Sequence, residues 1–290
     1  MDELVKTYPE LEQYIFEKND GGKTIDFSEP KAVKALNTAL LAHYYNIAVW
    51  DIPEGYLCPA IPGRADYIHH IADLLTLSND NVIPTGNKIV GLDIGVGANA
   101  AYPIIGSQCY GWRFVGSDID PISVKSATLI VDANHKLKNL LTVRKQTQPG
   151  DIFDGIIKPQ DNFAFTLCNP PFHSSAAEAQ QGSERKVKNL TRHSKKRNPS
   201  AAAEQAKQGL NFAGQHRELW CEGGELVFIC NMIRQSQKYA QQVNWFTSLV
   251  SKKDSLKGIY NQLERVGATE VKTVNMAQGQ KVSRFIAWRF

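Results

Sequence analysis

Residues 89–99 read Ile-Val-Gly-Leu-Asp-Ile-Gly-Val-Gly-Ala-Asn, a short apolar run that leads directly into a turn with two glycines. The run is typical of a buried strand, and Gly95 and Gly97 let the backbone pass close to a ligand where a Cβ would collide. A second apolar run, 112–117, is followed at once by Asp118. This order of strand, glycine turn and acidic strand end indicates an α/β fold with a nucleoside-binding edge.

The residues of the turn favour one class of nucleoside ligand. A dinucleotide-binding turn carries a third glycine, and Ala100 stands in its place here. The carboxylate of Asp93 suits the cationic amino-acid end of S-adenosylmethionine and would repel a pyrophosphate. Asp118 can accept hydrogen bonds from both ribose hydroxyls of an adenosine. The sequence therefore predicts an S-adenosylmethionine site that includes Asp93, Gly95, Gly97 and Asp118.

Short apolar runs alternate with turn or helical segments in the rest of the C-terminal part. This alternation predicts a mostly parallel sheet with helices on both faces. The expected strands are residues 88–94, 112–117, 140–145, 163–168 and 243–250. Two further runs, 269–276 and 282–290, predict a closing antiparallel hairpin.

The N-terminal part has a helical texture instead. Leu11, Ile15 and Phe16 recur at helix spacing, and a loop rich in Pro and Gly at 51–63 precedes a second helical run at 65–77. We therefore expect a helical N-terminal extension at 1–80 and an α/β domain with the S-adenosylmethionine site at 81–290. The extension is expected to help close the cofactor pocket.

The run 163–168 ends in Asn169-Pro170-Pro171-Phe172. Two prolines fix φ and end the strand, so Asn169 and the Pro170 carbonyl are expected at the carboxyl edge of the sheet, where α/β ligands bind. An adenine amino group is a poor nucleophile because its lone pair is delocalised into the ring. Two oxygens that accept its hydrogens would favour a pyramidal nitrogen, and Phe172 would stack on the base. The motif thus predicts methyl transfer to a planar amino nitrogen by positioning and electrostatics, with no metal.

Three acceptors present this same amino geometry: adenine in RNA, adenine in DNA and the amide of a protein glutamine. A catalytically silent RNA-binding module that keeps the fold is an alternative from a different class. The intact motif at 169–172 argues against a silent module.

Charge is divided unevenly along the chain. Residues 1–180 contain 14 Lys and Arg against 21 Asp and Glu, whereas residues 181–290 contain 19 against 8. The apolar period is lost over 172–217, which predicts a long basic loop. This loop argues against a purely protein substrate, and its predicted RNA-binding residues are Arg185, Lys186, Lys188, Arg192, Lys195, Lys196 and Arg197.

Five cysteines without C-x-x-C spacing predict reduced thiols and neither a disulfide framework nor a zinc site. No secretion, transit or membrane-spanning segment is expected from the sequence. We therefore expect a monomeric cytoplasmic protein without a membrane partner.

With both motifs placed, the chain resembles the bacterial 23S rRNA adenine N6-methyltransferase F family and, more distantly, its eukaryotic relatives that methylate a spliceosomal small nuclear RNA. The most specific matching pieces are residues 26–43, 62–70, 92–99, 167–173, 220–225, 245–250 and 276–280.

This resemblance implies a class I methyltransferase with a Rossmann-like sheet. It uses S-adenosylmethionine, releases S-adenosylhomocysteine, and acts on an adenine N6 in 23S rRNA or in a large-subunit assembly intermediate. The resemblance also implies that Arg64 pairs with the cofactor carboxylate, that Gly95, Asn99 and Asp118 complete the pocket, and that Gln146 lies near the adenine ring. Family members often begin with a basic arm, whose RNA contacts we expect to be lacking here or replaced by residues 185–197.

Overall fold

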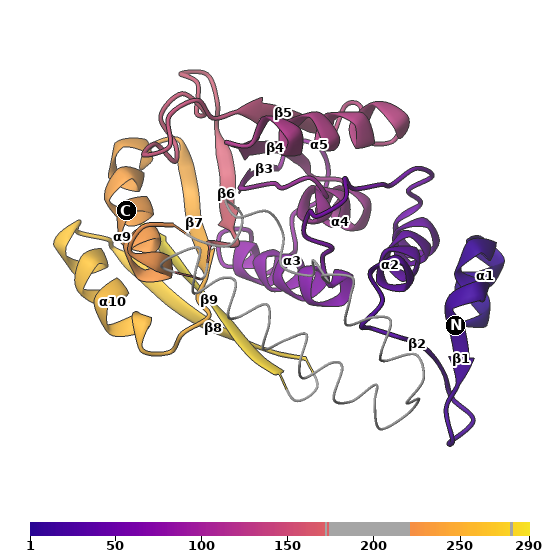
Figure 1. The fold of residues 1–290 in the computed structure, drawn as a ribbon. Helices are drawn as coiled ribbons and strands as arrows, with labels where there is room; N and C mark the ends of the chain where they lie inside the picture. The colour runs from indigo at the N-terminus through magenta and orange to yellow at the C-terminus, as the bar shows by residue number, and fades with distance from the viewer. Residues whose placement is uncertain (172, 174–220, 279–280) are drawn as a thin grey trace.

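The computed structural model describes residues 1–171, 173, 221–278 and 281–290. Within these residues, seven strands form one sheet in the order β5-β4-β3-β6-β7-β9-β8 (Figure 1). The strands from β5 to β7 run parallel, and β9 lies antiparallel between β7 and β8. The mostly parallel sheet with a closing hairpin is therefore confirmed.

Each predicted strand of this sheet forms, with its ends shifted by no more than two residues. The apolar runs end at glycine, proline or polar residues, which stop strands for local steric reasons. The observed strands are β3 (Val90–Ile94), β4 (Arg113–Asp118), β5 (Leu141–Lys145), β6 (Phe163–Cys168), β7 (Val243–Leu249), β8 (Glu270–Gln278) and β9 (Lys281–Arg289).

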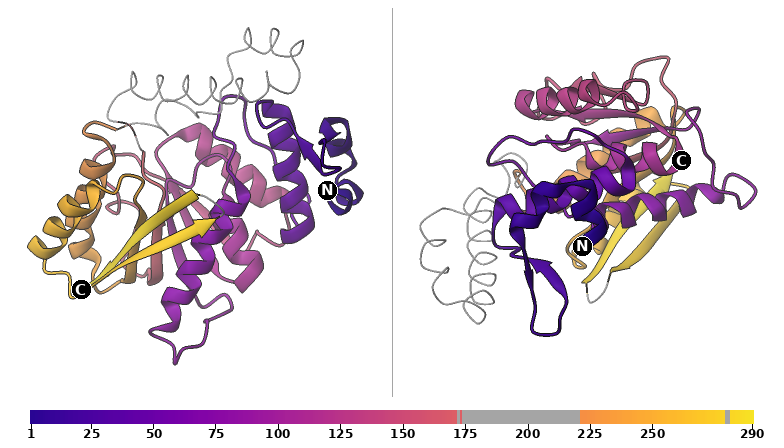
Figure 2. Two further views of the ribbon diagram at one scale, coloured as in Figure 1. Left: turned by 90° about the horizontal axis from the view of Figure 1, so that it is seen from below. Right: turned by 90° about the vertical axis from the view of Figure 1, so that its right-hand side faces the viewer.

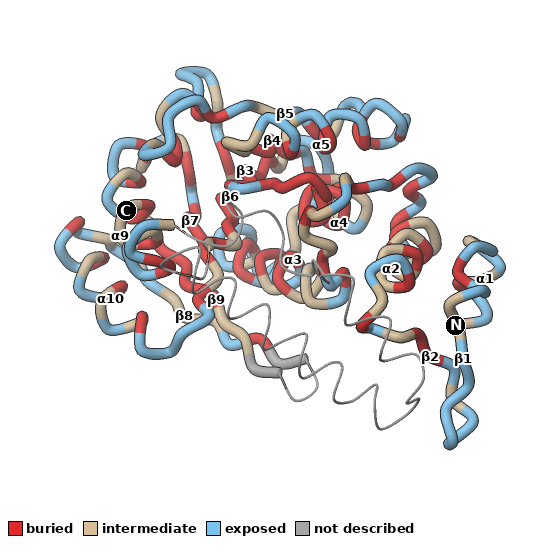
Figure 3. The backbone as a smooth tube through the Cα atoms, viewed as in Figure 1, coloured by how far each residue is buried: buried red, intermediate tan, exposed pale blue. Residues whose placement is uncertain are grey.

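Helices cover both faces of the sheet (Figure 2). One face packs against α3 (Ile61–Thr76), α4 (Ala101–Tyr110) and α5 (Pro121–Ala133), and the other packs against α9 (Gly224–Ser236) and α10 (Ser255–Arg265). A short 3-10 helix, Gln237–Tyr239, follows α9. Successive residues of β9 alternate between the two cores, with Phe285 in the first and Ile286 in the second, as the pleat requires. Buried residues accordingly concentrate at the sheet and the inner helix faces (Figure 3).

The N-terminal part contains more than helices. It comprises α1 (Asp2–Thr7), a 3-10 helix (Pro9–Tyr14), β1 (Ile15–Glu17), β2 (Lys23–Ile25) and α2 (Pro30–Tyr45). The helical interpretation of Leu11, Ile15 and Phe16 was wrong, since Leu11 lies in the 3-10 helix and the other two lie in β1. Strand β1 pairs antiparallel with β2.

A turn signal explains this hairpin. The strands are joined through the segment Asn19-Asp20-Gly21-Gly22, a composition that favours tight turns. Gly21 adopts φ +77°, and the N–H of Lys18 donates to the carbonyl of Gly22 at 2.8 Å. The local turn chemistry therefore overrode the helix-like spacing of the apolar side chains.

Helix α3 begins at Ile61, four residues before the predicted start at 65. Pro62 lies in its first turn, where the missing N–H costs nothing because no helical partner exists there. The earlier start places Arg64 on the helix. Buried Tyr67 and Ile68 join the same core as the sheet, and α3 contacts α4 and β8.

Within the described ranges, no helix combines the length and the apolar character needed to cross a membrane.

Candidate active site

The glycine turn follows β3 and lies against the end of β4. Gly95 and Gly97 adopt φ +74° and +64°, conformations that favour glycine. The N–H groups of Gly95 and Val96 both donate to the carbonyl of Ser117 at 2.9 Å. A Cβ built on Gly95 would meet no heavy atom within 4 Å, so the space above this residue is open.

Asp93 and Asp118 lie on adjacent strands, β3 and β4, but their carboxylates differ in hydrogen bonding. Asp118 Oδ2 accepts from the Gly97 N–H at 2.8 Å and Oδ1 accepts from the Asp120 N–H at 2.9 Å. Asp93 is fully buried, and both of its carboxylate oxygens lack a partner among the described residues. Burial raises the pKa of Asp118 and raises that of Asp93 well above its usual range, and the Asp118 charge raises the pKa of Asp93 further.

Arg64 supplies the opposite charge from the first turn of α3. Its Nη1 donates to the Tyr102 hydroxyl at 2.6 Å, and its guanidinium carbon lies 5.1 Å from the centroid of that ring. Arg64 is near enough to lower the pKa of Asp93, yet no hydrogen bond joins the two side chains. The Asp93 carboxylate and the Arg64 guanidinium are thus close but not bonded to each other. Such a pair can bind an amino acid, with the carboxylate on its ammonium group and the guanidinium on its carboxylate.

Asn99 and Gln146 use their amides to hold loops. Asn99 Oδ1 accepts from the Ala101 N–H at 3.0 Å, at the start of α4. Gln146 Oε1 accepts from the N–H groups of the next two residues, and its Nε2 donates to the Asp154 carbonyl at 2.8 Å. The Gln146 N–H donates to the Asp118 carbonyl at 2.8 Å, which places this residue beside the acidic strand end.

The Asn169 motif lies at the end of β6, next to the glycine turn. Cys168 pairs with Ile94 across β6 and β3, so the residues that follow each strand are neighbours. The side-chain oxygen of Asn169 is buried and has no hydrogen-bond partner among the described residues. Pro170 is buried and Pro171 is half-buried. This edge of the sheet thus holds two unpartnered acceptor groups, Asp93 and Asn169.

Part of the predicted site lies outside the described residues. This applies to Phe172, to the predicted loop at 172–217 except His173, and to all seven predicted RNA-binding residues, Arg185, Lys186, Lys188, Arg192, Lys195, Lys196 and Arg197. The backbone carbonyl of His173 accepts from the Cys221 N–H at 3.1 Å, where the described chain resumes.

Sequence reasoning missed two tyrosines near these groups. Tyr102 is on α4 and accepts from Arg64, and Tyr67 is on α3, where its ring meets that of Tyr102 at a centroid distance of 5.6 Å. Tyr102 lies in none of the matching pieces. Tyr67 lies in the piece 62–70, in which the resemblance assigned a role to Arg64 alone. Only the three-residue spacing of Arg64 and Tyr67 on one helix face could have suggested a shared location.

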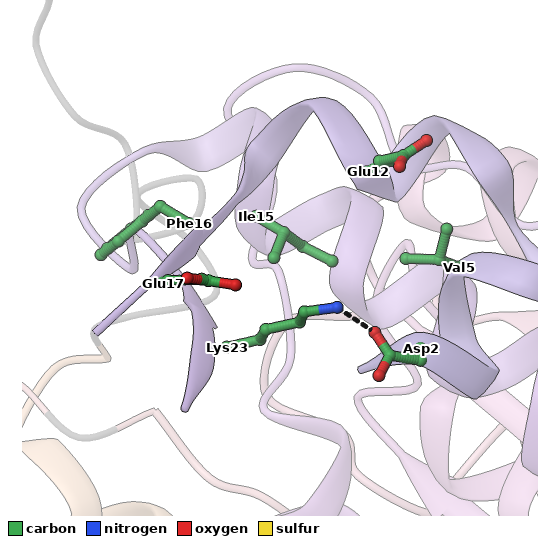
Figure 4. Close-up of a pocket in the computed structure, with 7 residues that line it drawn as sticks. All are labelled: Asp2, Val5, Glu12, Ile15, Phe16, Glu17 and Lys23. Atoms are coloured by element: carbon green, nitrogen blue, oxygen red, sulfur yellow. Dashed lines mark hydrogen bonds and ion pairs between the residues drawn. The ribbon is translucent and has the colours of Figure 1, made fainter. Parts of the chain in front are cut away.

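A hollow on the N-terminal unit is separate from this site (Figure 4). An exposed ion pair between Asp2 and Lys23 crosses it. It lies on the far side of α2 from the sheet, away from β3 and β6 (Figure 1). The chemistry described above therefore does not extend to it. In the described part of the chain, no group of three His, Cys, Asp or Glu side chains is arranged to hold a metal ion.

Comparison with known proteins gives one consistent family. The chain matches the family described as RNA methyltransferase over residues 1–290. The ribosomal RNA large subunit methyltransferase F of Pseudoalteromonas atlantica is 58% identical over 291 residues, which cover 100% of this chain and 88% of the relative.

Two solved human structures share the fold. The METTL16 catalytic domain in complex with MAT2A 3′UTR hairpin 1 aligns with a TM-score of 0.78 at 28% identity, over 99% of this chain and 90% of that one. The N-terminal domain of METTL16 in complex with SAH aligns with a TM-score of 0.73 at 25% identity, over 99% and 92%. From its sequence relatives and its full-length family match, this chain belongs to the RNA methyltransferase family, alongside the ribosomal RNA large subunit methyltransferases F.

Proposed function

We propose that this protein transfers the methyl group of S-adenosylmethionine to the N6 amino group of an adenine in 23S rRNA of the large ribosomal subunit. The observation that carries the proposal is a pair of buried acceptors, Asn169 Oδ1 directly after β6 and the Asp93 carboxylate on the neighbouring β3, neither of which has a partner among the described residues. An unsatisfied buried acceptor costs about 1–3 kcal/mol, so such groups persist where a ligand completes them. An adenine amino group and an ammonium group are donors that match the two sites.

The cofactor half of the site supports S-adenosylmethionine by charge and by space. In this proposal Arg64 binds the cofactor carboxylate, Asp93 binds its ammonium, and Asp118 accepts from the ribose hydroxyls. Gly95 leaves open space beside the chain, Gly97 adopts a positive φ that favours glycine, and Asn99 and Gln146 fix the surrounding loops. The cofactor supplies an electrophilic methyl group on a positively charged sulfur and leaves as S-adenosylhomocysteine.

The acceptor half positions the amino nitrogen. Asn169 Oδ1 accepts one N6 hydrogen and the Pro170 carbonyl accepts the other, which directs the nitrogen lone pair toward the methyl group. Pro171 holds this backbone, and Phe172 stacks on the base. As the N6–methyl bond forms, the methyl–sulfur bond breaks and N6 becomes positively charged. N6 then loses a proton to water, because the Asn169 amide has no basic atom at neutral pH. No covalent intermediate with the protein and no metal ion is required.

The RNA substrate is supported by the relatives. The P. atlantica relative is named as a large-subunit rRNA methyltransferase, and the human catalytic domain was solved with an RNA hairpin. We propose that the basic residues at 185–197 contact phosphates of 23S rRNA or of an assembly intermediate, which positions the RNA without reading its sequence. The extension at 1–80 contributes Arg64 to the cofactor pocket of the domain at 81–290, and the protein acts as a cytoplasmic monomer.

Tritiated methyl transfer tests the reaction. The purified protein is incubated with labelled S-adenosylmethionine and, separately, with total RNA, genomic DNA and cell protein, and the modified nucleoside or residue is identified by mass spectrometry. N6-methyladenosine in the large-subunit rRNA is expected. N6-methyladenine in DNA or methylglutamine in protein would establish one of the other acceptors, and binding of RNA without any transfer would establish a silent module.

A further inference from the structure

The pairing between β6 and β7 changes character just before Asn169. The parallel ladder joins Phe163 to Val243 and Phe165 to Trp245. Beyond this point hydrogen bonds that involve side chains join the two strands. The Thr247 N–H donates to Thr166 Oγ1 at 3.4 Å, and Thr247 Oγ1 donates to the Thr166 carbonyl at 2.7 Å. The end of β6 is therefore held on this side by side-chain hydrogen bonds.

The hydroxyl of Tyr67 connects helix α3 to the same two strands. It lies 2.7 Å from Thr247 Oγ1 on β7, and that hydroxyl in turn donates to the Thr166 carbonyl on β6. Thr247 gives its hydroxyl hydrogen to Thr166, so Tyr67 is the donor in its contact with Thr247. Tyr67 is fully buried, and burial raises its pKa well above the usual range, which keeps this donor proton in place.

Helix α3 reaches both halves of the site. Arg64 lies three residues before Tyr67, so the two side chains share one helix face. The Tyr67 ring meets the Tyr102 ring edge-on, at 5.6 Å between centroids, and Tyr102 accepts from Arg64. The same helix thus contacts the cofactor half through Arg64 and is linked to β6 through Tyr67 and Thr247.

We propose that Tyr67 is a positioning residue for methyl transfer, because its hydroxyl fixes the end of β6 and so the place of Asn169 relative to the cofactor pocket. This inference rests on the proposed role of Asn169 toward the acceptor amino group. Loss of the hydroxyl removes the donor to Thr247 Oγ1, so the Thr247 hydroxyl that holds the Thr166 carbonyl is no longer fixed by α3 and the strand end can shift. A displacement of about 1 Å at a reacting centre can cost about 100-fold in rate.

The substitution Tyr67→Phe tests the inference, since it keeps the ring and removes one oxygen. We expect kcat to fall roughly 10- to 100-fold while the dissociation constant of S-adenosylmethionine stays within about twofold. Hydrogen exchange of the peptide 163–169, followed by mass spectrometry, should become faster in the same variant. Thr247→Val should act in the same direction, and the double variant should be less impaired than the product of the two single effects.

Tyr110→Phe is the matched control. It also removes a tyrosine hydroxyl bonded to α3, at His69 with a distance of 2.7 Å, but it does so away from β6. Its kcat and its 163–169 exchange should equal those of the wild type. A Tyr67→Phe protein with wild-type kcat and wild-type exchange would overturn the inference. This holds even if the melting temperature of the variant falls, since Tyr67 would then act on stability alone.

The same measurements separate this inference from the proposed function. If the wild-type protein methylates RNA and Tyr67→Phe does so equally well, only the role of Tyr67 is wrong. If the wild type transfers no methyl group at all, the proposed function fails, and hydrogen exchange then decides whether Tyr67 fixes the strand end. Unchanged exchange would refute that role, and faster exchange would support it.

Discussion

The two halves of the carboxyl edge of the sheet are built by different means. At β3 and β4, backbone N–H groups of the glycine turn bond to the end of β4. The Gly95 N–H donates to the Ser117 carbonyl, and the Gly97 N–H donates to the Asp118 carboxylate. At β6 and β7, the ladder has stopped, and Thr247 with Tyr67 from a distant helix holds the strand end. The cofactor half is therefore specified by a local motif, whereas the acceptor half depends on tertiary packing of α3.

Both halves nevertheless keep a buried oxygen without a partner among the described residues, on Asp93 in one half and on Asn169 in the other. A site in which every buried oxygen already accepted a hydrogen bond would be more stable, but it would leave fewer acceptors for a ligand to bond. This contrast between the two halves predicts that substitutions in the cofactor half change the affinity for S-adenosylmethionine, whereas substitutions in the acceptor half change the rate of methyl transfer. The variants below test this division.

The largest effect is expected from Asn169→Ala. In the proposed reaction the side-chain oxygen acts on the acceptor nitrogen, so kcat should fall by roughly 10²- to 10³-fold or more, as for other preorganised polar groups at a reacting centre. The affinity for S-adenosylmethionine should stay within a few-fold. Single-turnover kinetics and calorimetric titration measure the two quantities, and an equal loss of cofactor affinity would mean that the motif is structural.

Asp118→Ala should produce the opposite pattern. Two charge-assisted hydrogen bonds to the ribose are lost, which weakens cofactor binding by about 1–3 kcal/mol. Because Asp118 also accepts from Gly97 and Asp120, the isosteric Asp118→Asn variant serves as a companion that keeps the size of the side chain. Unchanged affinity by calorimetry in both variants would remove Asp118 from the cofactor site.

The third prediction concerns pH and Asp93. Its pKa in the folded protein lies well above the ordinary 3.8, because of burial first and the Asp118 charge second, with Arg64 acting against them. Tyr102 on α4 and Cys168 on β6 also face this carboxyl. A raised folded-state pKa contributes stability that is fully present below the unfolded pKa and is lost as pH rises through the folded one. The unliganded protein should therefore become less stable as pH rises through that window.

Cofactor affinity should move in the other direction. In the proposed site the ammonium of S-adenosylmethionine pairs with the ionised carboxylate, so affinity should rise by up to about tenfold per pH unit while Asp93 releases its proton. Calorimetric titration in buffers of different ionisation enthalpy measures the proton released, and chemical denaturation at several pH values measures stability. The control is Asp93→Asn, since ionisation of the ligand itself is common to both proteins. Identical pH profiles for the two proteins would show that Asp93 does not titrate with binding.

Sequence predicts the cofactor half better than the acceptor half for a physical reason. The glycine turn, Asp93 and Asp118 could be found because the ends of consecutive parallel strands meet at one edge, and each end carries its own local signal. Asn169 was found in the same way, since two prolines mark its strand end. The role of Tyr67 was not predicted, because Tyr67 and Thr247 lie in two separate matching pieces, 62–70 and 245–250, and the sequence does not show that these residues, 180 positions apart, are in contact.

The fold shows the same division. Strands β3 to β9 follow from apolar runs between strong stop signals. The β1–β2 hairpin was missed because spacing of apolar residues was weighed above the Asn-Asp-Gly-Gly turn, and the start of α3 was missed because Pro62 was interpreted as a loop residue. In both cases glycine and proline carried the decisive local information.

The smallest effect, and the sharpest test of the two-half division, is expected from Tyr102→Phe. The Tyr102 hydroxyl accepts from Arg64 at 2.6 Å, and burial raises its pKa to about 12, so it remains a neutral acceptor near pH 7. Without this oxygen the guanidinium loses a fixed partner, and S-adenosylmethionine should bind about three- to tenfold more weakly with kcat unchanged, in keeping with about 1 kcal/mol for one hydrogen bond. In an Arg64→Ala background the same substitution should add nothing, because the group it orients is gone. The Tyr67 and Tyr102 rings touch, so a fall in kcat for Tyr102→Phe equal to that of Tyr67→Phe would show that the two halves act as one unit.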